Sequence, residues 1–163
     1  MGLDMYLYKK TYVKNWRHMK PDELHKITIK KGGKTRKDIK PERISYIVEE
    51  VGYWRKFNAL HNWFVQNCQG GVDECQQSDV SCEKLQELLE VLKNVQSLKP
   101  KDGEVTINEE KLEELLPTSS GFFFGGTDYD EYYFEDIDRT VKLLEELLKE
   151  DDQYDEYYYQ ASW

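Results

Sequence analysis

The sequence predicts an α+β fold in which a small antiparallel or mixed sheet packs against three or four helices. At the amino end, apolar and polar residues alternate with the period of a half-buried strand, and an aromatic segment at the carboxyl end has a similar pattern. Between these ends, apolar residues recur at helical spacing. A length of 163 residues with 39% hydrophobic content is enough for one core, so we expect a single domain over residues 1–163.

The first predicted element is a strand over residues 2–9, in which Leu3, Met5 and Leu7 face one side. The carboxyl-terminal segment Tyr157–Trp163 is expected to pair with this strand, because both segments carry alternating large side chains. The sheet is therefore expected to join the two ends of the chain.

A basic segment follows the first strand and extends to about Arg43. A short β-prone run within it, Ile27–Ile29, is ended by Gly32–Gly33. The residues expected in a solvated hairpin turn just after these glycines are Lys34, Arg36 and Lys37.

The next segment has two interpretations. Pro41 and Glu42 resemble a helix start, and the apolar residues from Ile44 to Trp54 recur at helical spacing. A strand over Ile44–Val51 competes with this helix, because its β-branched content is high and Gly52 could end it.

Four helices are predicted in the rest of the chain. The first carries one apolar face and is closed by Gly70–Gly71, the second starts at a Ser81 cap, and the third starts at an Asn108 cap. Their expected ranges are 53–67, 81–98, 108–116 and 131–150. The glycine-flanked segment Gly121–Gly126 is read as a buried strand or a tight apolar loop, and we expect Phe122–Phe124 to contribute to the sheet.

Charge is distributed unevenly along the chain. Residues 1–56 carry 15 Lys and Arg against 7 Asp and Glu, and residues 57–163 carry 8 against 25. The net charges of +8 and −17 could create a basic patch for nucleic acid or an acidic surface for basic partners. The opposite charges of the two halves could equally neutralise one another within the fold or in a homodimer. The sequence leaves these alternatives open.

No cofactor, metal or catalytic residue is assigned. Cys68, Cys75 and Cys82 are spaced by sevens, whereas zinc sites use closer pairs, and an odd number of cysteines suits a reducing compartment. Gly33-Lys34-Thr35 is not a phosphate loop, because that motif needs a glycine where this chain has Thr28. We therefore expect a binding protein, and an enzyme is the less favoured alternative.

One block combines several functional groups. On a helix over residues 53–67, Trp54, Asn58 and His61 would share a face and could bind a flat polar ligand, with Arg55 beside them. The alternative is that both polar groups satisfy buried backbone. The residues predicted to bind a ligand are Trp54, Arg55, Asn58, His61, Tyr132 and Tyr133.

The last two of these belong to an aromatic and acidic carboxyl-terminal third. Tyrosine is common at interfaces, so a partner surface or homodimer seam is expected there. The interleaved carboxylates would repel phosphates, which disfavours a nucleic-acid partner. An acidic surface that imitates nucleic acid is a further alternative.

Several unusual runs, distributed over nearly the whole length of the chain, resemble a family of hypothetical phage and prophage proteins. They are Met1–Leu7, Glu50–Val65 (EVGYWRKFNALHNWFV), Leu115–Thr118 with Gly121–Gly125, Tyr129–Tyr133 and Tyr158–Trp163. The resemblance implies an origin and carries no activity, cofactor or catalytic residue with it.

The expected function is therefore that of a phage-associated accessory protein, which binds a host protein or a small ligand without catalysing a reaction. The expected location is the cytoplasm of a bacterial host cell, because the sequence has no signal peptide and no apolar run long enough to span a membrane. One alternative is a nucleotide-like small-molecule enzyme or sequestering protein built on Trp54, Asn58 and His61. Another is nucleic-acid binding by the basic segment Lys9–Arg43.

Overall fold

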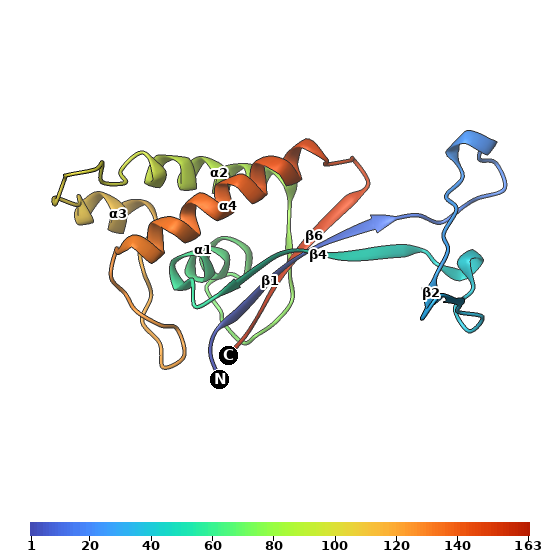
Figure 1. The fold of residues 1–163 in the computed structure, drawn as a ribbon, viewed down its shortest axis with the longest axis horizontal. Helices are drawn as coiled ribbons and strands as arrows, with labels where there is room; N and C mark the ends of the chain where they lie inside the picture. The colour runs from blue at the N-terminus through green and yellow to red at the C-terminus, as the bar shows by residue number, and fades with distance from the viewer.

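The computed structural model describes all residues 1–163 and confirms the α+β fold (Figure 1). Its main sheet has four antiparallel strands in the order β4-β1-β6-β5, and a separate hairpin pairs β2 with β3. The strands are β1 (Asp4–Tyr12), β2 (Lys30–Lys31), β3 (Lys34–Thr35), β4 (Tyr46–Arg55), β5 (Ser78–Val80) and β6 (Asp155–Ser162).

The two ends of the chain form the centre of the sheet. β1 and β6 pair antiparallel from Asp4 opposite Ser162 to Thr11 opposite Asp155, which confirms the predicted pairing. The termini consequently lie close together (Figure 1). The sequence prediction did not include β5, whose three residues are too few and too polar to give a strand pattern.

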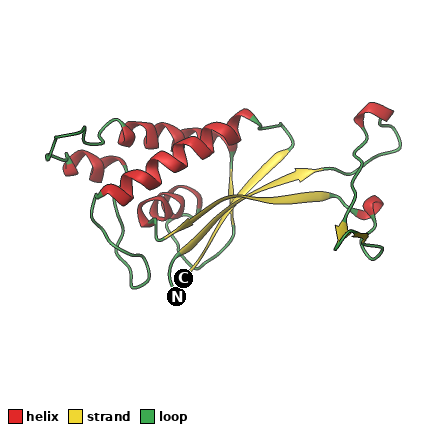
Figure 2. Ribbon diagram, in the orientation of Figure 1, coloured by secondary structure: helices red, strands yellow, loops and turns green.

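Four helices lie on one side of this sheet (Figure 2), and α3 packs against α2. They are α1 (Asn58–Cys68), α2 (Cys82–Gln96), α3 (Glu109–Leu115) and α4 (Glu131–Lys149), with two short 3-10 turns at Pro21–Glu23 and Pro41–Arg43. Side chains of Ser81, Asn108 and Asp130 accept hydrogen bonds from main-chain N–H groups in the first turns of α2, α3 and α4. The three predicted helices of the carboxyl-terminal half are thus confirmed.

The helical interpretation of residues 41–54 is wrong, and the competing strand is right. β4 extends past Gly52 to Arg55, so the next helix begins at Asn58 and not at Tyr53. A bulge near Val51 shifts the register against β1 between Leu7 and Tyr8. Pairing with β1 decides the conformation here, because the β-branched residues fit a strand once a partner is available.

Gly52 lies within the strand because the indole of Trp54 lies against it. An added Cβ at this position would come within 2.4 Å of the Trp54 ring. Gly52 therefore makes room for a large side chain that reaches into the core.

Phe122–Phe124 does not join the sheet as expected, and of the two alternatives for this segment the loop is right. The segment is a tight loop, in which the Phe124 N–H donates to the Gly121 carbonyl and the Leu3 N–H donates to the Phe123 carbonyl. Phe122 is 95% exposed, so the loop is anchored at the edge of the core and not buried in it. The flanking glycines favour such a turn over a strand.

One hydrophobic cluster of 25 buried residues lies between the sheet and the helices. None of these residues comes from the segment 14–45, in which no residue is buried. We call this segment the arm and the rest of the chain the body.

None of the helices has both the length and the apolar composition needed to cross a bilayer.

Candidate functional site

The structure separates the six predicted ligand-binding residues into four places. Trp54 belongs to β4 and His61 to α1, so the two do not share a helix face, contrary to the prediction. Asn58, Tyr132 and Tyr133 do come together around one cavity. Each place has its own chemistry.

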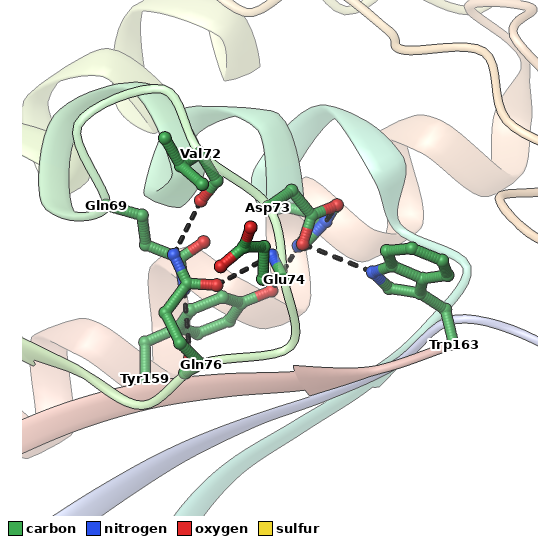
Figure 3. Close-up of polar contacts among 8 residues, drawn as sticks. Gln69, Val72, Asp73, Glu74, Gln76, Tyr159 and Trp163 are labelled. Atoms are coloured by element: carbon green, nitrogen blue, oxygen red, sulfur yellow. Dashed lines mark hydrogen bonds and ion pairs between the residues drawn. The ribbon is translucent and has the colours of Figure 1, made fainter.

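His61 joins three segments through a buried polar network. Its Nε2 lies 2.9 Å from an Asp73 carboxylate oxygen, and its Nδ1 lies 2.7 Å from the Tyr159 hydroxyl. The carboxylate can only accept, so Nε2–H donates to Asp73, while Nδ1 and the Tyr159 hydroxyl form the second hydrogen bond of the ring. The Trp163 indole N–H also donates to Asp73, at 3.1 Å, and Figure 3 shows this contact from the chain end to the loop after α1.

This network resembles an acid–base relay, but substrate cannot reach its centre. His61 is 1% exposed and Tyr159 is 0% exposed. Burial, followed by the negative charge of Asp73, raises the pKa of Tyr159 well above its ordinary value, so the phenol stays protonated. The network therefore ties the loop 69–76 and the last strand to α1. Within the loop, the Gln69 side chain donates to the Gln76 carbonyl and the Gln76 side chain donates to the Val72 carbonyl (Figure 3).

Asn58 holds the loop that follows α3. Its Nδ2 donates to the carbonyls of Phe124 at 3.0 Å and Gly126 at 2.8 Å, and its Oδ1 accepts from the Ser119 N–H at 2.9 Å. These bonds use most of the hydrogen-bonding capacity of the amide on the protein's own main chain. Asn58 thus satisfies the protein's own main chain, which is the alternative to ligand binding that the sequence left open for Asn58 and His61.

Trp54 and Arg55 point to opposite faces of the sheet. The Trp54 indole is buried, and its N–H donates to the Thr140 hydroxyl on α4 at 2.8 Å. Arg55 is exposed on the other face, where its Nε lies 4.0 Å from Asp4. Period-two alternation along β4 separates the two side chains, which the helical prediction had placed next to each other.

A cavity of about 190 Å³ lies between the α1 start, the 118–128 loop and α4. It is lined by Asn58, Tyr133 and the mouth residue Tyr132, which is 76% exposed, together with Lys56 and three aspartates. Burial raises the pKa of one of these carboxyls, Asp136, although Arg139 opposes the shift. The cavity is smaller than the range of about 300–1,000 Å³ typical of small-molecule sites.

The three thiols are free, and two of them are poor nucleophiles. Burial raises the pKa of Cys68 to about 11, and burial together with Asp151 raises the pKa of Cys82 to about 11. Both are therefore protonated near neutral pH, which argues against thiolate chemistry at these positions.

A group of tyrosines lies on the sheet face that no helix covers, and Figure 2 shows that face. Along β1, Met5 and Leu7 are buried, whereas Tyr6 and Tyr8 alternate with them and are half-buried. We call the four contacting rings the tyrosine face, which consists of Tyr6, Tyr8, Tyr53 and Tyr158.

Ring contacts connect the tyrosine face across three strands. The centroids of Tyr6 and Tyr53 are 5.3 Å apart, those of Tyr8 and Tyr158 are 4.8 Å apart, and those of Tyr6 and Tyr8 are 6.0 Å apart. Such cross-strand pairs stabilise a sheet and also fix the rings in place. The face is thus a rigid aromatic surface at the centre of the molecule.

Carboxylates border the tyrosine face. The Tyr53 hydroxyl donates to Asp4 at 2.5 Å, and this bond raises the pKa of Tyr53. Burial and then Glu50 raise the pKa of Tyr8. These phenols therefore remain neutral at physiological pH and present an apolar ring with a polar tip.

Sequence reasoning missed the partners of His61 and the tyrosine face. Asp73 and Tyr159 lie 12 and 98 residues from His61, and no local pattern connects them. The signal for the tyrosine face was present in the alternation of Tyr6 and Tyr8 with Met5 and Leu7. By itself this alternation indicates which side of the strand is buried, and it does not show that the tyrosines of three strands meet.

Comparison with models of protein families, with characterised proteins and with solved structures gave no match for this chain. The chain is therefore described by its own architecture. It is an α+β protein whose antiparallel sheet is covered by helices on one face and carries an aromatic surface on the other.

Proposed function

We propose that this chain is a binding protein that docks on another protein through the tyrosine face. The observation that carries the proposal is the set of four mutually contacting tyrosines on the uncovered side of the sheet. Tyrosine is enriched at protein interfaces because it brings a large rigid apolar area with a hydrogen-bonding tip at low entropic cost.

The charges around the face indicate the chemistry of the partner. Asp4, Glu50 and Glu156 lie on this side of the sheet, against Lys10 and Arg55. A slightly acidic border favours a partner whose apolar patch is surrounded by basic groups. The resemblance to hypothetical phage and prophage proteins supports a bacterial host protein as that partner, with the chain as a phage accessory protein in the host cytoplasm.

A small-ligand function has weaker support. The three candidate residues that meet at the cavity enclose about 190 Å³, and Asn58 is occupied by main-chain bonds. The burial of Trp54 and His61 leaves neither side chain available to a ligand. Ligand binding at Tyr132 and Tyr133 stays a prediction.

Site-specific photo-crosslinking in bacterial host cells tests the proposal. A photo-reactive phenylalanine analogue replaces Tyr53 or Tyr158 on the tyrosine face. In the controls the analogue replaces the exposed residue Tyr132, at the start of α4, or the exposed residue Tyr154, in the loop after α4. We expect one discrete protein adduct from the face positions and none from the controls. An adduct from Tyr132 alone, no adduct, or an adduct with a second copy of this chain would contradict the proposal.

Binding of the purified adduct partner then measures the contribution of the face. Tyr53→Ser should weaken binding by at least about tenfold, the loss typical of an aromatic hot spot, and Tyr154→Ser should leave it unchanged. Thermal unfolding of both variants verifies that each remains folded. Equal affinities for the two variants would overturn the proposed docking surface.

A further inference from the structure

The arm projects from the end of the main sheet (Figure 1). β1 and β4 lead into it as a two-stranded ribbon, and the Val13 N–H donates to the Ser45 carbonyl at 2.9 Å where the ribbon ends. Beyond this point the chain forms two loops, one of which contains the β2–β3 hairpin. Because no arm residue is buried, the arm presents almost all of its side chains to solvent.

The charge of the arm is opposite to that of the body. Residues 14–45 hold eleven Lys and Arg against four Asp and Glu, a formal charge of +7, whereas the rest of the chain holds twelve against twenty-eight, or −16. Mutual neutralisation within the fold is one of the alternatives that the sequence leaves open for these charges. Among the eleven cationic side chains, however, only Arg36 has an ion-pair partner, Asp38.

At the hairpin tip, like charges face each other. Lys31 pairs directly with Lys34 across the strands, and Lys30, the residue before Lys31, pairs with Thr35. The turn between them uses Gly32 and Gly33 at φ of 56° and 78°, which allows a tight connection. Opposed lysines repel each other in an isolated hairpin, and an approaching polyanion relieves that repulsion.

An exposed aromatic ring lies near the base of the arm. Trp16 is 49% exposed, and the Lys14 ammonium lies 5.2 Å from its ring centroid. The indole N–H donates to the Tyr12 hydroxyl at 2.9 Å, which fixes the ring on the ribbon. A fixed indole among cations offers a stacking surface next to phosphate-binding groups.

We infer that the arm binds the phosphate backbone of nucleic acid, independently of base sequence. Unpaired, exposed cations distributed over the two loops of the arm can contact several phosphates of one duplex at once. The β2–β3 hairpin is two-stranded, and a two-stranded ribbon is narrow enough to enter the major groove of a duplex, which is about 12 Å wide.

The acidic body does not prevent this binding. Charges in solution are screened over about 8–10 Å at physiological salt, and the arm carries its cations away from the helices (Figure 1). The carboxylates that disfavoured nucleic acid in the sequence lie on the body and not among the arm lysines. The separation therefore removes the objection that the net charge of −9 raises.

A protein partner, including the acidic body of a second copy, fits the arm less well. Eight of the eleven cations are lysines, and lysine is depleted at protein interfaces, whereas it is a common phosphate contact. The arm also lacks a contiguous group of aromatic anchors of the kind found on the tyrosine face. The lysine-rich composition thus favours phosphate.

Fluorescence anisotropy with a labelled 24-base-pair DNA duplex and with one of its strands, from 50 to 200 mM salt, tests the inference. If about five phosphates are contacted at once, log affinity for the duplex falls against log salt with a slope of about −4 to −5, which is a loss of several hundredfold over this range. A duplex of scrambled sequence should bind with the same affinity.

Two charge-matched variants make the test specific to the arm. Lys31→Glu with Lys34→Glu should reduce duplex affinity at 100 mM salt by at least about tenfold and lower the magnitude of the slope by about two. Lys101→Glu with Lys142→Glu has the same net charge and alters two exposed lysines of the body that have no ion-pair partner. This second variant should bind almost as the parent does.

Three results would overturn the inference. The first is that neither DNA binds at 50 mM salt. The second is that the two variants lose the same affinity for the duplex. The third is that the parent does not bind DNA but forms a dimer in native mass spectrometry, and that Lys31→Glu with Lys34→Glu dissociates this dimer. The last result would assign the arm to a second copy of this chain. Tighter binding to the single strand than to the duplex would retain the inference and assign Trp16 a stacking role.

Discussion

The body and the arm of this protein differ in nearly every physical respect. The body buries a cluster of 25 residues between a sheet and four helices, and the arm buries none. The body carries a formal charge of −16 and the arm one of +7. The comparison shows that one chain can keep its stabilising interactions in one region and present unpaired charge in another.

The difference also separates two candidate surfaces. The tyrosine face lies over the middle of the sheet and has aromatic rings with an acidic border, and the arm has lysines and one exposed indole. The proposed protein partner and the inferred nucleic acid therefore require different chemistry. Either proposal can fail without affecting the other.

The largest expected effect is at the junction where the arm leaves the body. The Lys9 ammonium lies 3.2 Å from Asp155, and their side chains are only 11% and 2% exposed. Asp155→Asn leaves the ammonium without its partner and should lower the free energy of unfolding by about 3 kcal/mol at pH 7, as measured by urea denaturation. Glu156→Gln, which affects an exposed pair with Lys10 at 3.6 Å, should cost less than about 0.5 kcal/mol.

The same junction predicts a pH dependence. Burial raises the pKa of Asp155, but hydrogen bonds from the Asp152 N–H and the Thr11 hydroxyl and the charge of Lys9 outweigh it, so the pKa lies below its ordinary value. A depressed folded-state pKa stabilises the fold above the unfolded value of about 4, and this stabilisation is lost as pH falls through the folded value. Stability of Asp155→Asn should therefore fall less steeply below pH 4 than that of the parent, and equal slopes would contradict the assignment.

A second effect tests the packing of the body under β4. Gly52→Ala places a methyl group 2.4 Å from the Trp54 ring, which the core prevents from moving, so we expect a loss of about 2 kcal/mol. Gly126→Ala is the matched control, because an added Cβ there meets nothing within 4 Å. Equal melting temperatures for the two variants would show that Trp54 can shift.

A smaller effect tests the buried hydrogen bond between the sheet and α4. Thr140→Val removes the acceptor of the Trp54 indole N–H and should cost about 1–2 kcal/mol, because the donor stays buried without a partner. Thr140→Ser keeps the hydroxyl and should retain most of the stability, apart from the lost methyl group. Chemical denaturation of both variants measures the difference, and a larger loss for the serine variant would contradict this role for the hydroxyl.

The smallest expected effect concerns the arm. Replacing residues 14–44 by an Asn-Gly turn should leave the free energy of unfolding unchanged or slightly higher, because no core residue is removed and a long loop is shortened. Thermal and urea unfolding measure it. A loss of more than about 1 kcal/mol would mean that the arm supports the body and is not mainly a surface for binding.

Local signals in the sequence were sufficient for much of the body. Ser81, Asn108 and the residues after them specify helix starts by side-chain hydrogen bonds to neighbouring N–H groups, and helical spacing specifies the inward faces of α2 and α4. The alternation of Leu3, Met5 and Leu7 likewise specified β1. These features depend on residues only a few positions apart.

The candidate site depended on contacts that no local pattern contains. The group of Trp54, Asn58 and His61 was inferred from helical spacing, and pairing of β4 with β1 moved Trp54 to a strand. The burial of His61 depends on Tyr159 and Asp73, and the fixed position of Asn58 depends on Ser119 and Phe124. A polar residue on an apolar helix face can bind a ligand or satisfy buried groups of the protein itself. Only its distant partners in the fold distinguish these two roles.

The sequence alone determined the fold class, the strand character of its amino end and three of its helices, because period and capping act between near neighbours. The matching alternation of the two chain ends suggested their pairing, and the core formed by the whole chain brings them together. Only the tertiary structure decided that β4 is a strand, that the tyrosines form one open face and that the cations of the arm remain unpaired. Each of these depends on which distant segments meet, and that is fixed by the packing of the whole core and not by any one segment.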